Sequence, residues 1–279
     1  MSIFSGYETI SNHGTSSGII PRFFDQPMEI ASYALDKAET DDRFSRFLKK
    51  NIADFTDFYD LYHEILKKYT AYKTGLKDGT YFSIGPNGEY RLDRSLELEF
   101  HRKIKDFYIL GRLLINNFAK SKIVDSEHFK LSSFILVNDK NFEKNKEIYF
   151  QNEPSKKFEV LIKILEKARH DFLNTFNQIR ADFEHENLEI PNFNVNTQTG
   201  EFTEPGITKS GSLIEEVTFC YNSILTMLER LMIYHYGILA LEKFKIMGLY
   251  VREEFDYSKL LYKYVLLPRM EMEKHKLIM

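Results

Sequence analysis

The sequence predicts an all-α fold, an up-and-down helical bundle with additional short helices and one or two small β-hairpin or loop insertions. Four long segments place apolar residues at steps of three and four, which is the spacing of one helix face. Only 13 Gly and 7 Pro occur in the 279 residues, too few turn residues for a many-stranded β-fold. With 43% hydrophobic residues the chain can bury a sizeable core, which a helical bundle would provide.

The N-terminal half is expected to begin with an arm and two long helices. Residues 1–20 are rich in Ser, Gly, Thr and Asn, which predicts a flexible arm, and a short helix is expected within 21–38. A long helix is predicted over about 42–72, because aromatic and aliphatic residues there follow a period of 3.6. The segment 81–91 has Gly-Pro-Asn-Gly at its centre, which predicts a β-hairpin. A second long helix is predicted over about 93–119.

Glycines help to define these two helices. Gly75 and Gly79 are expected to end the first of them. Gly111 lies on the apolar face of the second. Because a glycine has no side chain to keep a neighbour away, another helix is expected to approach closely at this position.

The middle of the chain leads into a third long helix. The segment 129–137 is compatible with either a strand or a short helix, and 138–152 is expected to be a polar connection. The third helix is predicted to start at Pro154, since proline suits a first helical position, and to be stopped by Pro191.

The last part of the chain is expected to contain one more long helix. A second hairpin or loop is predicted over 192–205, around Thr199-Gly200. A fourth helix is predicted over about 212–247 from its three–four alternation of apolar residues. The tail is expected to add a short helix that ends near Pro268.

Together these elements predict one domain. We expect a flexible arm over 1–20, followed by a single helical domain over 21–279. Its core is expected to consist of about 42–120 and 154–247, with 248–279 as a C-terminal extension.

Charge limits the partners that the chain can bind. The formal net charge of −3 predicts no general attraction to nucleic acid, so RNA binding would need a local basic patch. The 38 Lys and Arg residues are spread along the sequence rather than clustered in it. Lys163, Lys167, Arg169 and His170 lie together on the predicted third helix and are candidates for such a patch.

The sequence also predicts a cytoplasmic protein. The single Cys220 cannot form an internal disulfide, and its place in an apolar helix predicts a small buried residue. The first twenty residues lack the basic and apolar regions of a signal peptide. No apolar stretch is expected to approach the ~20 residues that span a bilayer, so no membrane role is expected.

An arginine and a histidine lie close together near the end of the predicted third helix, in Arg180-Ala-Asp-Phe-Glu-His185. Such a pair can act on a phosphodiester without a metal, because histidine moves protons and arginine holds the phosphate charge. Spacing alone does not select this pair, since three others are similarly spaced: Arg94 with His101, Arg230 with His235, and Arg269 with His275. Only Arg180 and His185 end a long helix among polar residues, whereas His235 lies on an apolar stripe and is expected in the core.

The helix that ends in this motif, the loop after it and the returning long helix resemble a HEPN domain. This helical-bundle family has the signature Arg, four to six residues, then His, and the resemblance covers mainly 154–247. It implies a metal-independent endoribonuclease or RNA-processing protein that needs no cofactor and cleaves phosphodiesters by His/Arg chemistry. By this resemblance Arg180 would stabilise the phosphorane and His185 would transfer protons. RNA, a second copy of the chain in a homodimer, and a partner or antitoxin protein are the implied partners.

The motif also has features of its own. The residue after the arginine is often Asn or another polar residue in the family, whereas here it is Ala181. Asp182 is expected to reach His185 and favour one of its tautomers. Glu184 either supports the site or forms an ordinary surface ion pair with Arg180.

Helix geometry sets a condition on this site. Five residues at ~100° each place Arg180 and His185 about 140° apart around a regular helix. Both can therefore reach one phosphate only if the helix unwinds near His185 or a second protomer contributes.

Two other functions are compatible with the sequence. One is a di-metal carboxylate site in the bundle. Its candidate ligands are Asp60, His63, Glu97, Glu99, Asp182 and His185. The other is a non-catalytic module that binds a partner chain or a nucleic acid, with tyrosines available to stack on unpaired bases.

Overall fold

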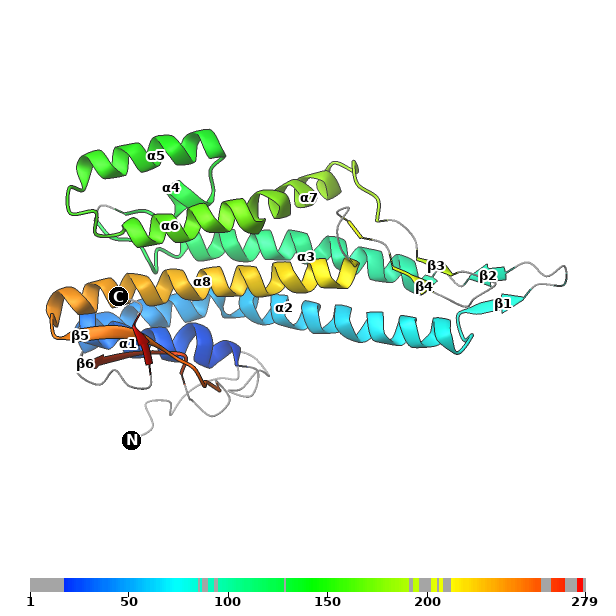
Figure 1. Cartoon of the computed structure of the whole chain (residues 1–279), viewed down its shortest axis with the longest axis horizontal. Coiled ribbons are helices and arrows are strands. Elements are labelled where there is room, and N and C mark those ends of the chain that lie inside the picture. The colour runs from blue at the N-terminus through cyan, green and yellow to red at the C-terminus, as the bar shows by residue number, and fades with distance from the viewer. Residues whose placement is uncertain are drawn as a thin grey trace. The chain divides into compact units, whose positions relative to one another are not determined.

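The computed structural model is mostly helical, as the sequence predicts, and its small antiparallel sheets are short (Figure 1). It describes residues 18–84, 86, 90–92, 95–127, 129–190, 193–195, 202–204, 206–207, 212–256, 262–268 and 275–277. The chain divides into two compact units. Unit 1 is Met1–Thr56, Leu114–His170 and Leu225–Met279, and unit 2 is Asp57–Leu113 and Asp171–Ile224. The expected single domain over 21–279 stays a prediction.

Three long helices and two hairpins occur where the sequence predicts them. Helix α2 (Lys37–Lys77) exceeds its predicted range at both ends, while α3 (Ser95–Lys120) and α8 (Leu213–Lys243) agree with theirs within a few residues. Strands β1 (Phe82–Ile84) and β2 (Tyr90–Leu92) form the first hairpin.

The second predicted hairpin is also confirmed. Strand β3 (Asn194–Val195) pairs antiparallel with β4 (Phe202–Thr203), on either side of the predicted turn. The turn residues Thr199 and Gly200 lie outside the described residues.

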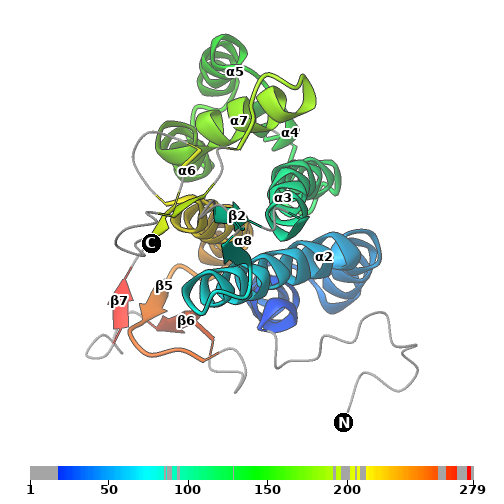
Figure 2. The same ribbon diagram turned by 90° about the vertical axis from the view of Figure 1, so that its right-hand side faces the viewer.

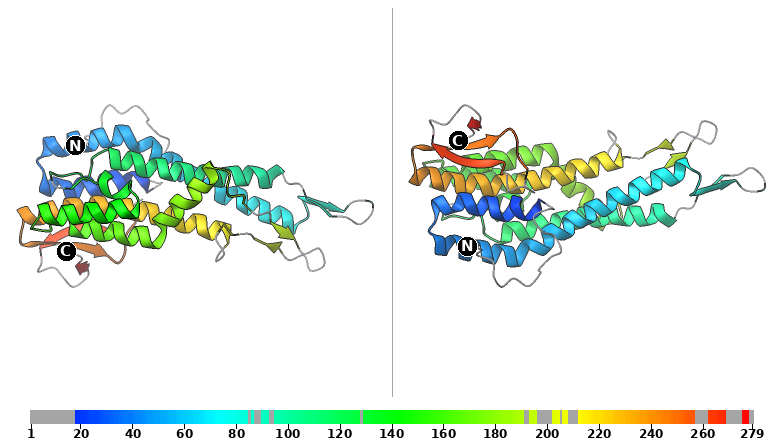
Figure 3. Two further views of the ribbon diagram at one scale, coloured as in Figure 1. Left: turned by 90° about the horizontal axis from the view of Figure 1, so that it is seen from above. Right: turned by 90° about the horizontal axis from the view of Figure 1, so that it is seen from below.

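The start of unit 1 contains the short helix expected within 21–38. It consists of a π-helical turn, η2 (Pro21–Asp25), which continues into α1 (Gln26–Ala34), and α1 lies beside the start of α2 (Figure 3). Of the expected arm, residues 1–17 lie outside the described residues, whereas Ile19 is helical and buried. The described residues 18–20 therefore do not belong to a flexible arm.

The tail forms a sheet, so the prediction of a short helix ending near Pro268 is wrong. Strands β5 (Met247–Arg252), β6 (Tyr264–Pro268) and β7 (His275–Leu277) form an antiparallel sheet in the order β6-β5-β7. In the register, Leu249 lies opposite Leu266 and Tyr250 opposite Val265. Aromatic and branched residues favour a strand once a partner strand is present. The partner of β6 ends more than ten residues before it, so a local pattern does not reveal the pairing.

The segment 138–152 is a helix, which corrects the prediction of a polar connection. Helix α5 (Asp139–Asn152) starts with a side-chain cap, in which Asn138 Oδ1 accepts a bond of 2.9 Å from the Asn141 amide. Only Phe142 and Tyr149 are buried on it, so its apolar pattern is too sparse to recognise. Of the two forms considered for 129–137, the short helix is present as α4 (Ser132–Ile135).

The predicted third helix starts later and is built in pieces. Residues 154–158 are turns, and α6 (Glu159–Ala168) leads through the π-helical η3 (Arg169–Leu173) into α7 (Asn174–Glu184). In unit 1, α6 lies between α5 and α8 (Figure 2), and an ion pair joins Lys146 of α5 to Glu166 of α6. The helix ends at Glu184, well before Pro191, so proline is not what stops it.

Helix α8 is more apolar than the sequence reading allowed. It is long and apolar enough to cross a membrane by length and composition, which corrects the expectation that no stretch approaches such a span. However, 67% of its most apolar 18-residue window is buried inside the protein, as in a core helix. Cys220, on this helix, is buried as predicted, and burial raises the pKa of its thiol to about 12.

Gly111 is the point of close approach that the sequence predicts. A Cβ atom on Gly111 would lie 2.9 Å from Phe176 Cζ and 3.0 Å from Phe58 Cε2. It would also lie 3.3 Å from Ile224 Cδ1. In unit 2, residues of α2, α7 and α8 therefore pack directly against the α3 backbone, because position 111 has no side chain. The next residue, Arg112, is brought beside α7.

Candidate functional site

All four predicted site residues lie at the end of α7. Arg180 and Glu184 lie in the last turns of the helix, and His185 is the residue that caps it, with φ −93° and ψ 6°. Glu186 is in the left-handed region at φ 58°, and the Asn187 amide donates a 2.8 Å bond to the Asp182 carbonyl. The regular helix therefore ends just before His185, where the predicted site required unwinding or a second protomer. That Arg180 and His185 reach one phosphate stays a prediction.

Arg180 is already paired on its own helix. Its guanidinium donates to the carboxylate of Glu184, four residues later, which is the ordinary ion pair that the sequence also allowed. About a quarter of the Arg180 side chain is exposed. Its buried Nε has no hydrogen-bond partner among the described residues. The arginine is thus held in place with part of its donor capacity unused.

A second arginine, from α3, contacts α7 nearer the start of that helix. Arg112 Nη1 donates a bond of 3.2 Å to Asn177 Oδ1, and Asn177 lies seven residues before Glu184 on α7. Arg112 was not among the sequence candidates. Its neighbour Gly111 was the available signal, because the close approach predicted there brings the next side chain against α7.

Nearby positive groups lower the pKa of Glu184. The pKa of the Glu184 carboxyl is below its usual value, first because Arg180 donates a hydrogen bond to it. The positive charges of Arg180, His185 and Arg112 lower it further. We call Arg112, Asn177, Arg180, Glu184 and His185 the Glu184 cluster. It brings two arginines and a histidine to one helix, α7, and guanidinium groups are donors that suit a phosphate.

The remaining motif residues do not orient the histidine. Asp182 Oδ1 accepts a 2.9 Å bond from Gln178 Nε2, one turn earlier. This carboxylate therefore bonds Gln178 instead of making the expected contact with His185. His185 is exposed, and its imidazole has no hydrogen bond within the described part of the chain. Ala181 adds no polar group to the cluster.

The residues suggested for a metal site have other partners. Glu97 is buried, and its Oε1 accepts a 2.7 Å bond from the Phe193 amide. Glu99 forms a 2.7 Å ion pair with Lys68. Within the described ranges, no group of three or more His, Cys, Asp or Glu residues is placed to hold a metal ion.

One member of the basic patch suggested on the third helix is buried. Arg169 is only 6% exposed and donates to Asp139 and to the Val137 carbonyl, so it anchors the start of α5 to the end of α6. Lys163 pairs with Glu159 at 2.8 Å. A different group of six basic side chains, from separate segments of unit 1, lines one pocket.

Of the other Arg–His pairs, only Arg230 with His235 lies wholly within the described residues. His235 is fully buried, as predicted, and stacks on Phe158 with ring centroids 5.4 Å apart. Arg94 and Arg269 lie outside the described residues.

Comparison with protein-family models, with curated proteins and with solved structures finds no match. The resemblance to HEPN domains thus stays a prediction from the Arg180–His185 motif and its helices. Function must be inferred from the chemistry of the site residues themselves.

Proposed function

We propose that the protein is a HEPN-like, metal-independent endoribonuclease that binds the scissile phosphodiester of RNA at the Glu184 cluster. The observation that supports this most is the ion pair of Arg180 with Glu184 at the end of α7, beside His185 and on the same helix that Arg112 contacts at Asn177. A carboxylate held by arginines occupies the kind of position that a phosphate group favours, since both are anions recognised by guanidinium donors.

The chemistry would proceed through the RNA itself. The 2′-oxygen attacks the adjacent phosphorus and loses its proton, the bond from phosphorus to the 5′-oxygen breaks, and that oxygen takes up a proton. The products are a 2′,3′-cyclic phosphate and a 5′-hydroxyl. His185 would move these protons as general base or acid, and Arg180 and Arg112 would hold the charge that develops on the phosphorane oxygens.

The Glu184 carboxylate must leave Arg180 before a phosphate can bind to this arginine. It is an exposed partner in an ion pair four residues apart, a kind worth only about 0.3–0.5 kcal/mol. A phosphodiester can therefore take its place at Arg180 at little energetic cost.

Assembly and location stay predictions. A homodimer is the commonest symmetric assembly, and it would bring a second His185 and Arg180 to a site that has one of each. A partner or antitoxin protein and a cytoplasmic location are proposed with the same resemblance.

The first test is cleavage of mixed RNA in excess EDTA. We expect the wild type to cleave and to leave cyclic phosphate ends. His185→Ala should slow cleavage by about 10²–10⁴-fold, because it removes the proton-transferring group. Arg180→Ala should slow it by about 10²-fold or more, because it removes charge stabilisation of the phosphorane.

The control is His170→Ala, which removes another exposed histidine of the chain. This variant should cleave at the wild-type rate, and circular dichroism should show equal helix content in all proteins. Equal rates for wild type and His185→Ala would reject the assignment of the site. Cleavage that EDTA abolishes would reject the metal-independent mechanism.

A non-catalytic RNA-binding module is the second candidate. It is favoured by the absence of a hydrogen bond to the His185 imidazole within the described residues, and by Ala181 beside Arg180. Binding without cleavage in the same assay, weakened by Arg180→Ala, would select this function.

A further inference from the structure

A concave basic surface lies in unit 1, outside the Glu184 cluster. It is a pocket of about 540 Å³ formed by α2, the end of α3 and the segment that follows α3. We call it the basic pocket. Its lining consists of Arg43, Arg46, Lys50, Lys120, Ser121, Lys122, Ile123, Asp125, Ser126, Glu127 and Lys130. Six basic and two acidic side chains therefore share one cavity in a chain whose net charge is −3.

The fold brings these charges together from separate parts of the sequence. Arg43, Arg46 and Lys50 are spaced by three and four residues, so they lie along one face of α2. Lys120 ends α3, and the chain then turns so that Lys122 and Lys130 join the same lining.

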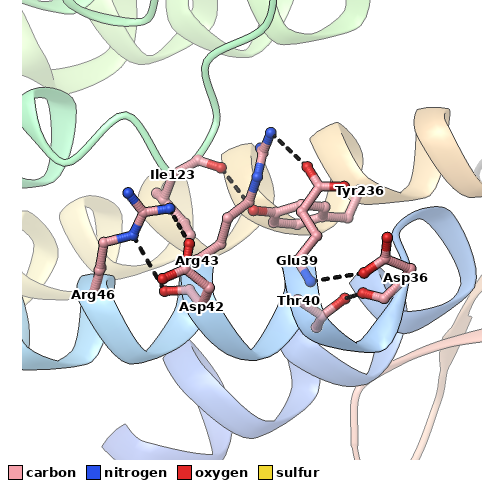
Figure 4. A network of polar contacts seen from close by, with 8 residues as sticks. All are labelled: Asp36, Glu39, Thr40, Asp42, Arg43, Arg46, Ile123 and Tyr236. Carbon is pink, nitrogen blue, oxygen red and sulfur yellow. Dashed lines mark hydrogen bonds and ion pairs between the residues drawn. The ribbon is translucent and has the colours of Figure 1, made fainter.

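The wall of the basic pocket is fixed by buried contacts. Tyr236 of α8 is fully buried and donates a 2.8 Å bond to the Ile123 carbonyl, which holds the segment after α3 opposite Arg43 and Arg46 (Figure 4). Asp125 Oδ1 accepts a 3.0 Å bond from the Leu131 amide, so this carboxylate serves the turn itself. The pocket is therefore built on an ordered turn.

Lys122 has a backbone conformation that lysine rarely adopts. Its φ is 62°, in the left-handed region that glycine or asparagine normally supplies after a helix. A side chain there costs on the order of 1 kcal/mol relative to glycine. An outlier of this kind is a reason to look for a function of the side chain, and here the side chain is a cation of the basic pocket.

Helix electrostatics explain only part of this charge. Lys120 and Lys122 lie at the C-terminus of α3, where cations stabilise the exposed carbonyl groups. Arg43, Arg46 and Lys50 come from another helix, so that effect does not require them.

Arg46 has only a weak partner among the described residues. It pairs with Asp42 through side chains that are 67% and 61% exposed, whereas Arg43 is one-third exposed, pairs with Glu39 at 2.9 Å and also hydrogen-bonds the buried Tyr236 (Figure 4). An exposed pair contributes little, so the Arg46 guanidinium is available to a stronger anion.

We propose that the basic pocket binds a compact polyanion with two or more adjacent phosphate groups. Its volume is in the range of small-ligand pockets, about 300–1,000 Å³. Its cations are gathered in one cavity, which matches closely spaced phosphates better than the singly charged, widely spaced phosphates of an RNA strand. Ser126 adds a hydroxyl group to the lining, which suits phosphate oxygens, whereas the Ser121 hydroxyl donates to the Phe118 carbonyl at 2.6 Å. This proposal does not depend on cleavage at the Glu184 cluster.

The test is calorimetric titration of the full chain with inorganic tripolyphosphate at low salt. A triple variant, Arg46→Gln with Lys50→Gln and Lys130→Gln, removes three exposed charges of the lining. The matched control is Lys49→Gln with Lys140→Gln and Lys144→Gln, three exposed lysines outside it. Because one charge-assisted contact contributes about tenfold in affinity, the triple variant should bind about 10²-fold more weakly or worse. The control should bind within about threefold of the wild type.

A nucleoside triphosphate serves as the second probe. Tighter binding than tripolyphosphate would show that the ligand carries a nucleoside, and equal binding would show that the phosphates alone are recognised; either supports the pocket. No binding of either probe, or equal losses in the two triple variants, would overturn the proposal. A 2′-O-methyl RNA oligonucleotide that binds while tripolyphosphate does not would also overturn it, in favour of an extended nucleic-acid surface.

Discussion

Replacing Arg22 by methionine is expected to lower the free energy of unfolding by about 3 kcal/mol, at the lower end of the range for a broken buried ion pair. Nε and Nη2 of Arg22 donate to the same oxygen of Glu229, at 3.0 and 2.8 Å, and Glu229 is fully buried. Without the arginine, a carboxylate is left in the core of unit 1. Lys263, whose charge also interacts with Glu229, would offset part of the loss. Urea unfolding followed by circular dichroism measures the change.

Two further variants separate this effect from a general loss of charge. Arg46→Met removes an arginine whose pair with Asp42 is exposed, and should cost less than about 1 kcal/mol. Arg22→Met combined with Glu229→Met should recover most of the stability, because no buried charge is left alone. A single Arg22→Met variant as stable as Arg46→Met would contradict the described contact.

Replacing His235 by phenylalanine is expected to make the protein more resistant to acid. Burial lowers the pKa of His235 from 6.5 to about 3, and the charges of Arg43 and Lys157 add to this. Between these two pH values the unfolded chain binds a proton that the folded protein does not. Falling pH therefore favours unfolding by about 1.4 kcal/mol per pH unit. Phenylalanine can keep the stack on Phe158 and binds no proton in either state. The free energy of unfolding of His235→Phe relative to the wild type should therefore rise by about 2 kcal/mol from pH 6.5 to pH 5.

The pH dependence of stability must be compared between wild type and His235→Phe, because in the wild type alone Asp25 has the opposite effect. Burial raises the pKa of Asp25 from 3.8 to about 6. Between those values the folded protein holds a proton that the unfolded chain has lost, so stability falls as pH rises. The difference between wild type and His235→Phe cancels this contribution. A pH-independent difference between the two proteins would contradict the lowered pKa of His235.

Local pattern predicts the long helices because most of their stability comes from one apolar face. The stripe on α3 even predicts the close approach at Gly111, since a glycine on a buried face needs a neighbour to fill the space. The same reasoning fails for α5, which buries only Phe142 and Tyr149 and depends on contacts with α4 and α6. It fails for β6 because the partner strand decides its structure.

The candidate site was predictable only in its local part. Arg180, Glu184 and His185 lie within one short segment, so their spacing indicates the motif. Arg112 comes from another helix, and its position depends on packing between α3 and α7. The basic pocket could not be predicted for the same reason. Its cations are dispersed in the sequence, and tertiary contacts such as the bond from Tyr236 to the Ile123 carbonyl bring them together.

The most direct test of the Glu184 cluster is the affinity of the Glu184→Gln variant for a non-cleavable RNA, such as a 2′-O-methyl oligonucleotide. If the Glu184 carboxylate holds the position of the substrate phosphate, removing its charge frees Arg180 and ends a repulsion. Binding should then tighten by about tenfold. Glu186→Gln, which removes an exposed charge two residues away, should change the affinity by less than about twofold. Equal affinities for Glu184→Gln and the wild type would contradict the assignment of this cluster as the phosphate site.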